Sequence, residues 1–271
     1  MSAPPLVLCI AGHDPSGGAG VIADVQAVSA LGCHPLSVIT ALTVQDSRNV
    51  REVAPVTAAL IERQLELLLE DSRISAIKIG LIGEPAQIPV IARLIERCGV
   101  PVVLDPVLRA GGGGDLASAA VQRALIDQLM PRVTVCTPNA AEARRLAGSD
   151  DLQAGAAMLL ALGCANLLIT GGDEPTPGSV YNTWHRAQAE PRTWLWPRLP
   201  QGFHGAGCTL ASVIAARLAL GDALEAALDN AQRWVHEALA RSYAIGQGRR
   251  IPNRLPNRLP NRLPNRLPGQ Q

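Results

Sequence analysis

The fold is decided by residues 6–31, which read Leu6-Val-Leu-Cys-Ile-Ala-Gly-His-Asp-Pro-Ser-Gly-Gly-Ala-Gly-Val-Ile-Ala-Asp-Val-Gln-Ala-Val-Ser-Ala-Leu31. The apolar run Leu6–Ala11 predicts a strand buried on both faces. Apolar residues recur at helical spacing over Gly20–Leu31, and a glycine-rich loop joins the two segments. A strand, a tight loop and a helix in this order predict the start of a βαβ crossover in a parallel sheet.

The same alternation continues along the chain. Further strands are expected at Leu36–Leu42, Ala76–Ile82, Val102–Leu104, Val133–Cys136 and Asn166–Thr170. Further helices are expected at Thr57–Asp71, Ala86–Cys98, Ala117–Met130, Ala140–Leu146 and Leu152–Leu162. A β-ribbon at Ser179–Trp184 and Arg192–Trp196 and two helices at Cys208–Ala219 and Leu224–Tyr243 complete the pattern. This order predicts an α/β fold with a doubly wound, mostly parallel central sheet.

Composition and charge narrow the class of protein. Of the 271 residues 48% are hydrophobic but only 3% are aromatic, so we expect an aliphatic core in one main domain over residues 1–248. Six of the 24 basic residues follow residue 248, which leaves 18 basic against 23 acidic residues in the body. A slightly acidic body argues against a nucleic-acid interface and favours a small-molecule partner.

The apolar runs and the cysteines exclude other classes. No apolar run reaches membrane-spanning length and no basic leader precedes the first strand, so a cytoplasmic location is expected. The six cysteines contain no C-x-x-C pair, which argues against a zinc site and a disulfide framework.

The C-terminal residues 249–271 contain the sequence Pro-Asn-Arg-Leu four times in succession, from Pro252 to Leu267. A proline in every fourth position suits neither a helix nor a paired strand. We therefore expect a disordered or polyproline-like basic tail, and we expect truncation after Gly248 to leave activity intact. A basic interaction tail is the functional alternative.

Two glycine-rich loops carry the first chemical signals. Ala11–Gly20 has neither the G-x-G-x-x-G nor the P-loop spacing, so it predicts a close approach to a ligand, with a purely topological turn as the alternative. Phe203–Thr209 precedes an apolar helix and predicts an anion hole of backbone N–H groups.

Cys208 lies where a helix N-terminus should lower the pKa of a thiol, which would suit a general base. A buried structural cysteine and a covalent nucleophile are the alternatives.

Acidic and amide side chains follow three other predicted strands. Asp105 and Glu142 could hold the magnesium ion of a bound nucleotide. Glu142 could equally cap the helix that begins after Asn139, and both roles are compatible. Gln45 offers an amide that could pair with an amino group and a ring nitrogen, although a solvated loop glutamine is the ordinary explanation.

Six motifs together resemble the hydroxymethylpyrimidine/phosphomethylpyrimidine kinases of thiamine biosynthesis. They are Ile10–Asp24, Ser37–Gln45, Ile77–Gly80, Leu104–Val107, Thr137–Glu142 and His204–Thr209, in family order from about residue 6 to about residue 245. The cysteine of the H-G-x-G-C-T pattern separates this family from the sugar kinases, which carry an aspartate there. The resemblance implies a ribokinase-like three-layer α/β/α sandwich and a homodimer.

The resemblance also implies an activity and its residues. The activity is ATP-dependent phosphorylation of 4-amino-5-hydroxymethyl-2-methylpyrimidine and then of its monophosphate, with Mg²⁺. The implied residues are Gly12, Ala19, Asp24 and Gln45 for the pyrimidine, Cys208 with Gly205, Ala206 and Gly207 for catalysis, Asn139, Thr170, Gly172 and Thr209 for ATP and phosphate, and Asp105 and Glu142 for the metal.

Several positions depart from the family pattern. His13 replaces a small hydroxyl residue, Gly111–Asp115 replaces Ser-Gly-Asp, and Thr170 stands where a lysine precedes two glycines. Lys78, the one lysine in the sequence, lies in an apolar strand and is expected to be structural. Phosphate neutralisation is then left to magnesium, backbone N–H groups or an arginine such as Arg109, which weakens the case for the second phosphorylation. A pyridoxal kinase and a catalytically silent pyrimidine- or nucleotide-binding protein are the rival functions.

Overall fold

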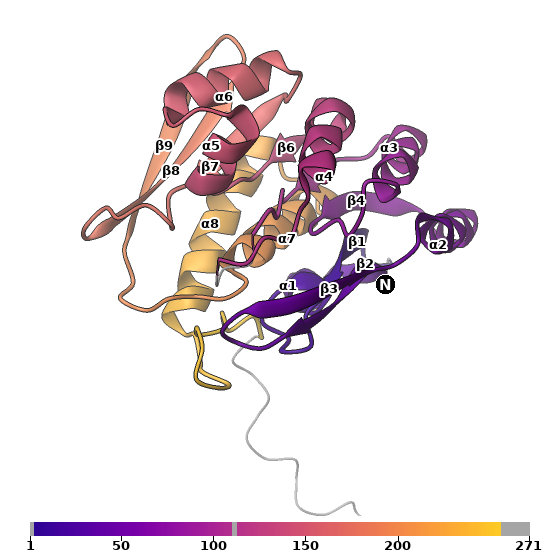
Figure 1. Ribbon diagram of the computed structural model, residues 1–271, viewed down its shortest axis with the longest axis horizontal. Helices are drawn as coiled ribbons and strands as arrows, with labels where there is room; N and C mark the ends of the chain where they lie inside the picture. Colours follow the sequence, from indigo (N-terminus) through magenta and orange to yellow (C-terminus); the bar gives the residue numbers. More distant parts are fainter. Residues whose placement is uncertain (1–2, 110–112, 256–271) are drawn as a thin grey trace, which may run out of the picture.

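The computed structural model describes residues 3–109 and 113–255 and contains one nine-stranded sheet (Figure 1). The strands are β1 Leu6–His13, β2 His34–Gln45, β3 Val50–Pro55, β4 Ile74–Ile79, β5 Val102–Leu104, β6 Val135–Cys136, β7 Asn166–Thr170, β8 Ser179–Arg186 and β9 Ala189–Pro197. Their order in the sheet is β3-β2-β1-β4-β5-β6-β7-β8-β9. The six strands from β2 through β1 to β7 pair in parallel, whereas β3, β8 and β9 pair antiparallel at the two edges.

Helices cover both faces of this sheet. They are α1 Gly20–Ala30, α2 Ala58–Asp71, α3 Gln87–Cys98, α4 Ala119–Ala124, α5 Ala140–Ala147, α6 Leu152–Ala161, α7 Ala206–Ala219 and α8 Leu224–Ala240. Helices α2 to α6 contribute to one apolar cluster, and α1, α7 and α8 contribute to the other. The predicted mostly parallel α/β architecture is confirmed, with helices as the two outer layers (Figure 1).

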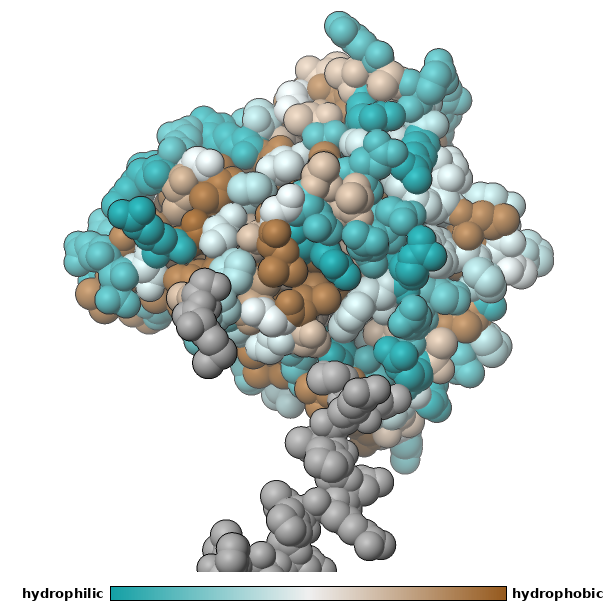
Figure 2. All heavy atoms as spheres, turned by 180° about the vertical axis from the view of Figure 1, so that it is seen from behind, coloured by the Kyte–Doolittle hydropathy of each residue, from teal (hydrophilic) through white to brown (hydrophobic). Residues whose placement is uncertain are grey.

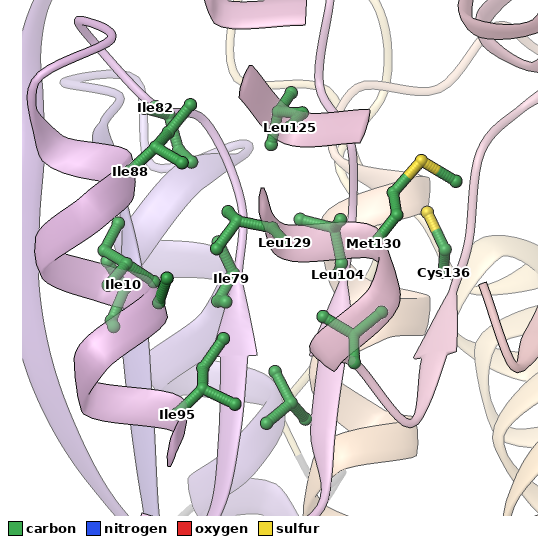
Figure 3. Packing of buried hydrophobic residues seen from close by; sticks show 14 of the residues in the cluster. Ile10, Ile79, Ile82, Ile88, Ile95, Leu104, Leu125, Leu129, Met130 and Cys136 are labelled. Carbon is green, nitrogen blue, oxygen red and sulfur yellow. The ribbon is translucent and has the colours of Figure 1, made fainter. Parts of the chain in front are cut away.

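Strand β1 shows why both faces must be covered. Its side chains alternate, so Leu8 and Ile10 join the cluster under α2 to α6 while Val7 and Cys9 join the cluster under α1, α7 and α8. In Figure 3 Ile10 lies beside Ile79 of β4, with the side chains of α3 packed over them. A strand without a polar face can be stable only in the middle layer.

Two segments differ from the predicted ones. The edge strand β3 was not predicted, because its charged and proline-containing sequence has the features of an exposed edge rather than of a buried strand. The helix expected over Ala117–Met130 is divided into α4, a π-helical turn at Leu125–Leu129 and a 3₁₀ turn at Met130–Arg132. Pro131 lies inside the last turn, and proline interrupts regular α-helical hydrogen bonding.

The packed chain extends beyond the predicted domain end at residue 248. Asn253 N–H donates to the carbonyl of Ala238, and Ile251 pairs through its backbone with Tyr243. The Arg254 side chain is only 1% exposed. Residues 249–255 are therefore part of the folded body. The other residues of the expected tail, 256–271, lie outside the described chain.

The surface opposite the view of Figure 1 is largely hydrophilic, with smaller hydrophobic areas between the polar ones (Figure 2). Among residues 3–109 and 113–255, no helix combines the length and the apolar character needed to cross a bilayer.

A buried ion pair joins β4 of the sheet to the helices α1 and α7 that cover one of its faces. Lys78 of β4 donates to both carboxylate oxygens of Asp24 of α1, at 2.8 and 2.9 Å, and both side chains are fully buried. Ser212 of α7 donates its hydroxyl to the same carboxylate at 2.8 Å. One buried carboxylate thus fixes two helices and the central strand relative to one another.

Replacing Lys78 with Met should lower the free energy of unfolding by about 3–5 kcal/mol, because Asp24 would be left buried without a counter-charge. Urea denaturation followed by circular dichroism measures this change. The double variant Lys78→Met/Asp24→Leu removes both charges and should recover most of the loss. A single variant within about 1 kcal/mol of wild type would contradict the prediction.

Candidate active site

A cavity of about 680 Å³ lies at the carboxyl ends of the parallel strands. It is bounded by Gly12 near the end of β1, Leu81 after β4, Asp105 after β5, Thr137 after β6 and the N-terminus of α7. The chain leaves β1 toward β2 on one side and returns to β4 on the other. A ligand site at such a point of reversal is typical of open α/β sheets.

The first glycine-rich loop is folded around Asp14. Its carboxylate accepts the N–H groups of Ser16 and Ala19, at 2.8 and 2.9 Å, and the hydroxyl of Ser16 at 3.0 Å. Burial alone would raise the pKa of Asp14, but the hydrogen bonds from His204 and Ser16 outweigh burial and lower it. This internal anion holds the loop that carries Gly12 and Ala19, both of which line the cavity as predicted for substrate-binding residues.

His204 joins the two glycine-rich loops. Its Nε2 lies 2.7 Å from Asp14 Oδ2 and 3.1 Å from Gln45 Nε2. A Cβ atom on Gly18 would overlap the His204 ring, so only glycine permits this approach. Asp14 was expected only as part of the first motif, and His204 only as a nearby group that would keep a covalent thiol nucleophile at Cys208 possible. Gln45, predicted to contact the pyrimidine, lies in the cavity wall beside them.

The predicted anion hole is present at the N-terminus of α7. Gly205 is the N-cap with a φ of 81°, and Ala206, Gly207 and Cys208 form the first turn, two residues earlier than expected. The N–H groups of a first turn lack partners within the helix. All four residues line the cavity, so these donors and the positive end of the helix dipole are available to an anion.

Asp105 faces this helix terminus. A Cβ atom built on Gly207 would lie 3.8 Å from Asp105 Oδ1. The Asp105 side chain is 4% exposed, and its Oδ2 has no hydrogen-bond partner among the described residues. Burial raises the pKa of Asp105, while the nearby Lys78 acts in the opposite direction. A buried carboxylate oxygen without a partner is suited to binding a cation or a proton from the substrate side.

The lowered pKa expected for the Cys208 thiol is wrong. Burial raises the pKa of Cys208 to about 12, Lys78 lowers it, and Asp105 and Asp24 raise it further. Removal from water outweighs the helix terminus, because only the charged thiolate loses hydration. Cys208 is therefore a neutral thiol until a neighbouring group or a ligand favours its ionised form.

The structure places Asp24 behind the cavity rather than in its lining. The carboxylate is fully buried in the ion pair with Lys78, and it is Lys78 that reaches the cavity wall. Asp24 was expected to contact the pyrimidine because it falls within the first motif. In a helix whose buried face turns toward the sheet, that position points inward instead.

Glu142 forms the capping box that was one of its two expected roles. The Asn139 side chain accepts the Glu142 N–H at 2.8 Å, and Glu142 Oε2 accepts the Asn139 N–H at 3.1 Å. Glu142 Oε1 also accepts the Leu108 N–H at 3.2 Å. Both oxygens are occupied, so Asp105 is the acidic candidate with an oxygen free for a metal. Among the described residues, no group of three potential ligands forms a protein-only metal site.

The remaining predicted phosphate residues divide into two groups. Asn139, Thr170 and Gly172 line the cavity. Thr209 is fully buried beneath it, where its hydroxyl donates to the Gly205 carbonyl at 2.6 Å. Thr209 thus supports the first turn of α7 from below instead of lining the cavity.

Arg109 and Arg198 both line the cavity that Thr170, which stands in place of the family's lysine, also lines. Arg109, the expected candidate, lines the cavity, pairs with Asp115 at 3.2 Å and is more than half exposed. Arg198, which sequence analysis missed, lines the cavity and donates to the carbonyls of Gly172, Thr176 and Glu174, at 3.0, 2.8 and 2.7 Å. No motif marks Arg198, because the chain brings it back to this turn only through the β8–β9 hairpin.

The stability of the ligand-free protein should depend on the protonation of Glu142. Burial, and then Asp105, raise the pKa of Glu142 from 4.5 to about 8. Between these values the folded protein holds a proton that the unfolded chain has released, so the free energy of unfolding falls as pH rises toward 8. Glu142→Gln cannot ionise and should show a shallower fall in denaturation experiments across this range. Glu62→Gln, on the exposed surface, is the control, and a wild-type slope in Glu142→Gln would refute the prediction.

Comparisons with known proteins agree with this geometry. The chain matches the phosphomethylpyrimidine kinase family over residues 14–253. The hydroxymethylpyrimidine/phosphomethylpyrimidine kinase of Streptomyces coelicolor is 35% identical over 258 residues, which cover 90% of this chain and 92% of that protein.

Two solved structures share the fold. The pyridoxal kinase of Staphylococcus aureus in complex with pyridoxal superposes with a TM-score of 0.86 at 28% identity, covering 95% of this chain and 96% of that chain. The phosphomethylpyrimidine kinase of Clostridium difficile 630 gives a TM-score of 0.74 at 30% identity, covering 86% and 99%. By sequence and by fold, this chain belongs to the phosphomethylpyrimidine kinase family.

Proposed function

We propose that this protein transfers the γ-phosphoryl group of ATP to the hydroxymethyl group of 4-amino-5-hydroxymethyl-2-methylpyrimidine, and then phosphorylates the monophosphate. The observation that carries this proposal is the arrangement at the N-terminus of α7, where Cys208, the free first-turn N–H groups and the unpartnered oxygen of Asp105 meet in one cavity. These are the parts that phosphoryl transfer requires, namely an anion hole, a proton acceptor and a cation site.

The two ends of the cavity differ in chemistry, which suggests where each substrate lies. Gly12, Ala19 and Gln45 come from the N-terminal loop and β2, and the Gln45 amide can pair with an aminopyrimidine edge. Thr170, the last residue of β7, and Gly172, which follows β7, lie on the other side of α7 and would receive the nucleotide. The anion hole lies between these two ends, where the transferred phosphoryl group would be.

In the proposed reaction the alcohol oxygen forms a bond to the γ-phosphorus while the bond from this phosphorus to the bridging oxygen of ADP breaks. The thiol of Cys208 first releases its own proton to the solvent, and the resulting thiolate then accepts the alcohol proton. Burial opposes that ionisation, and the positive charge of Lys78 favours it. Backbone N–H groups of α7 would stabilise the charge on the migrating group.

Magnesium, a homodimer and a cytoplasmic location belong to the same proposal. Asp105 offers one free carboxylate oxygen, and Mg²⁺ commonly binds one or two carboxylates together with substrate phosphates and water. Bound with ATP, the ion would neutralise phosphate charge. The family resemblance supports the homodimer, and the use of ATP supports the cytoplasm.

A pyridoxal kinase is the second candidate, favoured by the TM-score of 0.86 to the Staphylococcus aureus enzyme. Pyridoxal and the pyrimidine share a ring-bound hydroxymethyl group, so the same anion hole would serve both. The 35% identity to a hydroxymethylpyrimidine/phosphomethylpyrimidine kinase, against 28% to the pyridoxal kinase, favours the pyrimidine.

Purified protein with Mg²⁺ and ATP should release ADP on addition of the hydroxymethylpyrimidine, and mass spectrometry should find the phosphorylated pyrimidine. Parallel reactions with its monophosphate and with pyridoxal compare kcat/KM. We expect kcat/KM to be at least about tenfold higher for the pyrimidine than for pyridoxal. A preference for pyridoxal would favour the second candidate, and binding of the pyrimidine without ADP release would mean a silent binding protein.

Cys208→Ala should lower kcat by about 100-fold or more while KM for the pyrimidine changes little, because a general base acts only on the reacting proton. Steady-state kinetics measure both constants. Cys98→Ala, which alters a half-buried cysteine of α3, is the matched control. An unchanged kcat in Cys208→Ala would remove the thiol from the mechanism.

A further inference from the structure

The first Pro-Asn-Arg-Leu repeat places an arginine under the anion hole. Arg254 is 1% exposed and lies between α7 and the first glycine-rich loop. A Cβ atom on Gly205 would lie 2.7 Å from an Arg254 terminal nitrogen, so the guanidinium is in direct contact with the N-cap of α7. The repeat thus reaches the residue at which the anion hole begins.

The hydrogen bonds of Arg254 link elements far apart in the sequence. Its Nε donates to Thr209 Oγ1 at 2.8 Å, and one terminal nitrogen donates to the carbonyls of Gly18 and Gly205, at 2.5 and 3.5 Å. The other terminal nitrogen donates to the Gly17 carbonyl at 3.4 Å and to Gln26 Oε1 at 3.2 Å. One side chain therefore ties the loop before α7 to the loop after β1.

All of these acceptors are neutral. Among the described residues Arg254 makes no ion pair within 4 Å, although Asp14 and Asp24 are close enough to act on its charge. Burying a cation without a direct counter-ion is costly, even when all of its donors are paired with neutral acceptors. The uncompensated charge lies behind the helix terminus that receives the phosphoryl group, where positive potential is useful.

We propose that Arg254 is a positioning residue for phosphoryl transfer, which fixes the Gly205–Gly207 turn against the Gly17–Gly18 loop and adds positive charge behind the anion hole. The inference rests on the proposed kinase function. It predicts a loss in kcat with little change in KM, because the turn must be held most tightly when charge develops on the migrating group.

Arg254→Met, which preserves much of the volume but removes every donor, should lower kcat for the pyrimidine by about 30-fold or more, with KM for ATP and pyrimidine within about threefold. Arg254→Lys should retain more activity than Arg254→Met. In Arg254→Ala, added guanidinium at low, non-denaturing concentration should restore part of kcat. Arg233→Met, on the exposed face of α8, is the matched control and should behave as wild type.

Truncations test the same inference without a side-chain substitution. A chain that ends after Leu255 keeps the first repeat and Arg254 and loses the other three repeats. A chain that ends after Ile251 loses all four repeats and therefore Arg254. The first truncated protein should keep the wild-type kcat. The kcat of the second should fall by about as much as that of Arg254→Met. This reverses the expectation that truncation after Gly248 is harmless, since that cut also removes Arg254.

The outcomes separate this inference from the proposed function. If the wild-type protein releases no ADP with the pyrimidine, the kinase proposal fails. If wild type is active and a folded Arg254→Met, checked by circular dichroism and thermal unfolding, keeps kcat within about twofold, the role of Arg254 is overturned. An equal loss in Arg254→Met and Arg254→Lys without guanidinium rescue of Arg254→Ala would also overturn it.

Discussion

The buried ion pair between Asp24 and Lys78 is the constraint on which the rest of the site depends. It attaches α1 to β4, and the hydroxyl of Ser212 attaches α7 to the same carboxylate. The N-terminus of α7 can act on a ligand only if it is held at the carboxyl ends of β4 and β5. A buried ion pair fixes the position of α7 closely, because any displacement would leave a buried charge without its partner.

The same exclusion of water explains the proton chemistry of the cavity. Burial raises the pKa of Asp105, Glu142 and Cys208, and Lys78 is the cation that opposes this effect at Asp105 and Cys208. Burial therefore favours the proton-bound forms of these three groups in this cavity. Its acids and its thiol become reactive when a ligand or cation changes the local charge, which ties proton transfer to substrate binding.

Sequence patterns predicted the fold well, because the alternation of strands and helices and the all-apolar character of β1 depend on local periodicity. The residues of the site were also predictable, since Gly12, Gln45, Asp105 and Gly205–Cys208 all lie near the ends of strands or at the start of a helix. Contacts made by tertiary packing were not. The inward direction of Asp24, the contact of Arg198 with the turn after β7 and the effect of burial on the thiol of Cys208 depend on distances in space.

The replacement of the family's lysine by Thr170 is best understood from the distribution of cations around the cavity. Arg198 braces the turn after Thr170, Lys78 lies beside Cys208, and Arg254 lies behind Gly205. Each is fixed by several hydrogen bonds, whereas a lysine reaching from a strand end would have to order a flexible side chain on binding. Lys78 is already paired with Asp24, so the two of these cations without a carboxylate partner among the described residues are Arg198 and Arg254, and their positive charge would favour the added phosphate of the monophosphate. The absence of the lysine is therefore compatible with both phosphorylation steps.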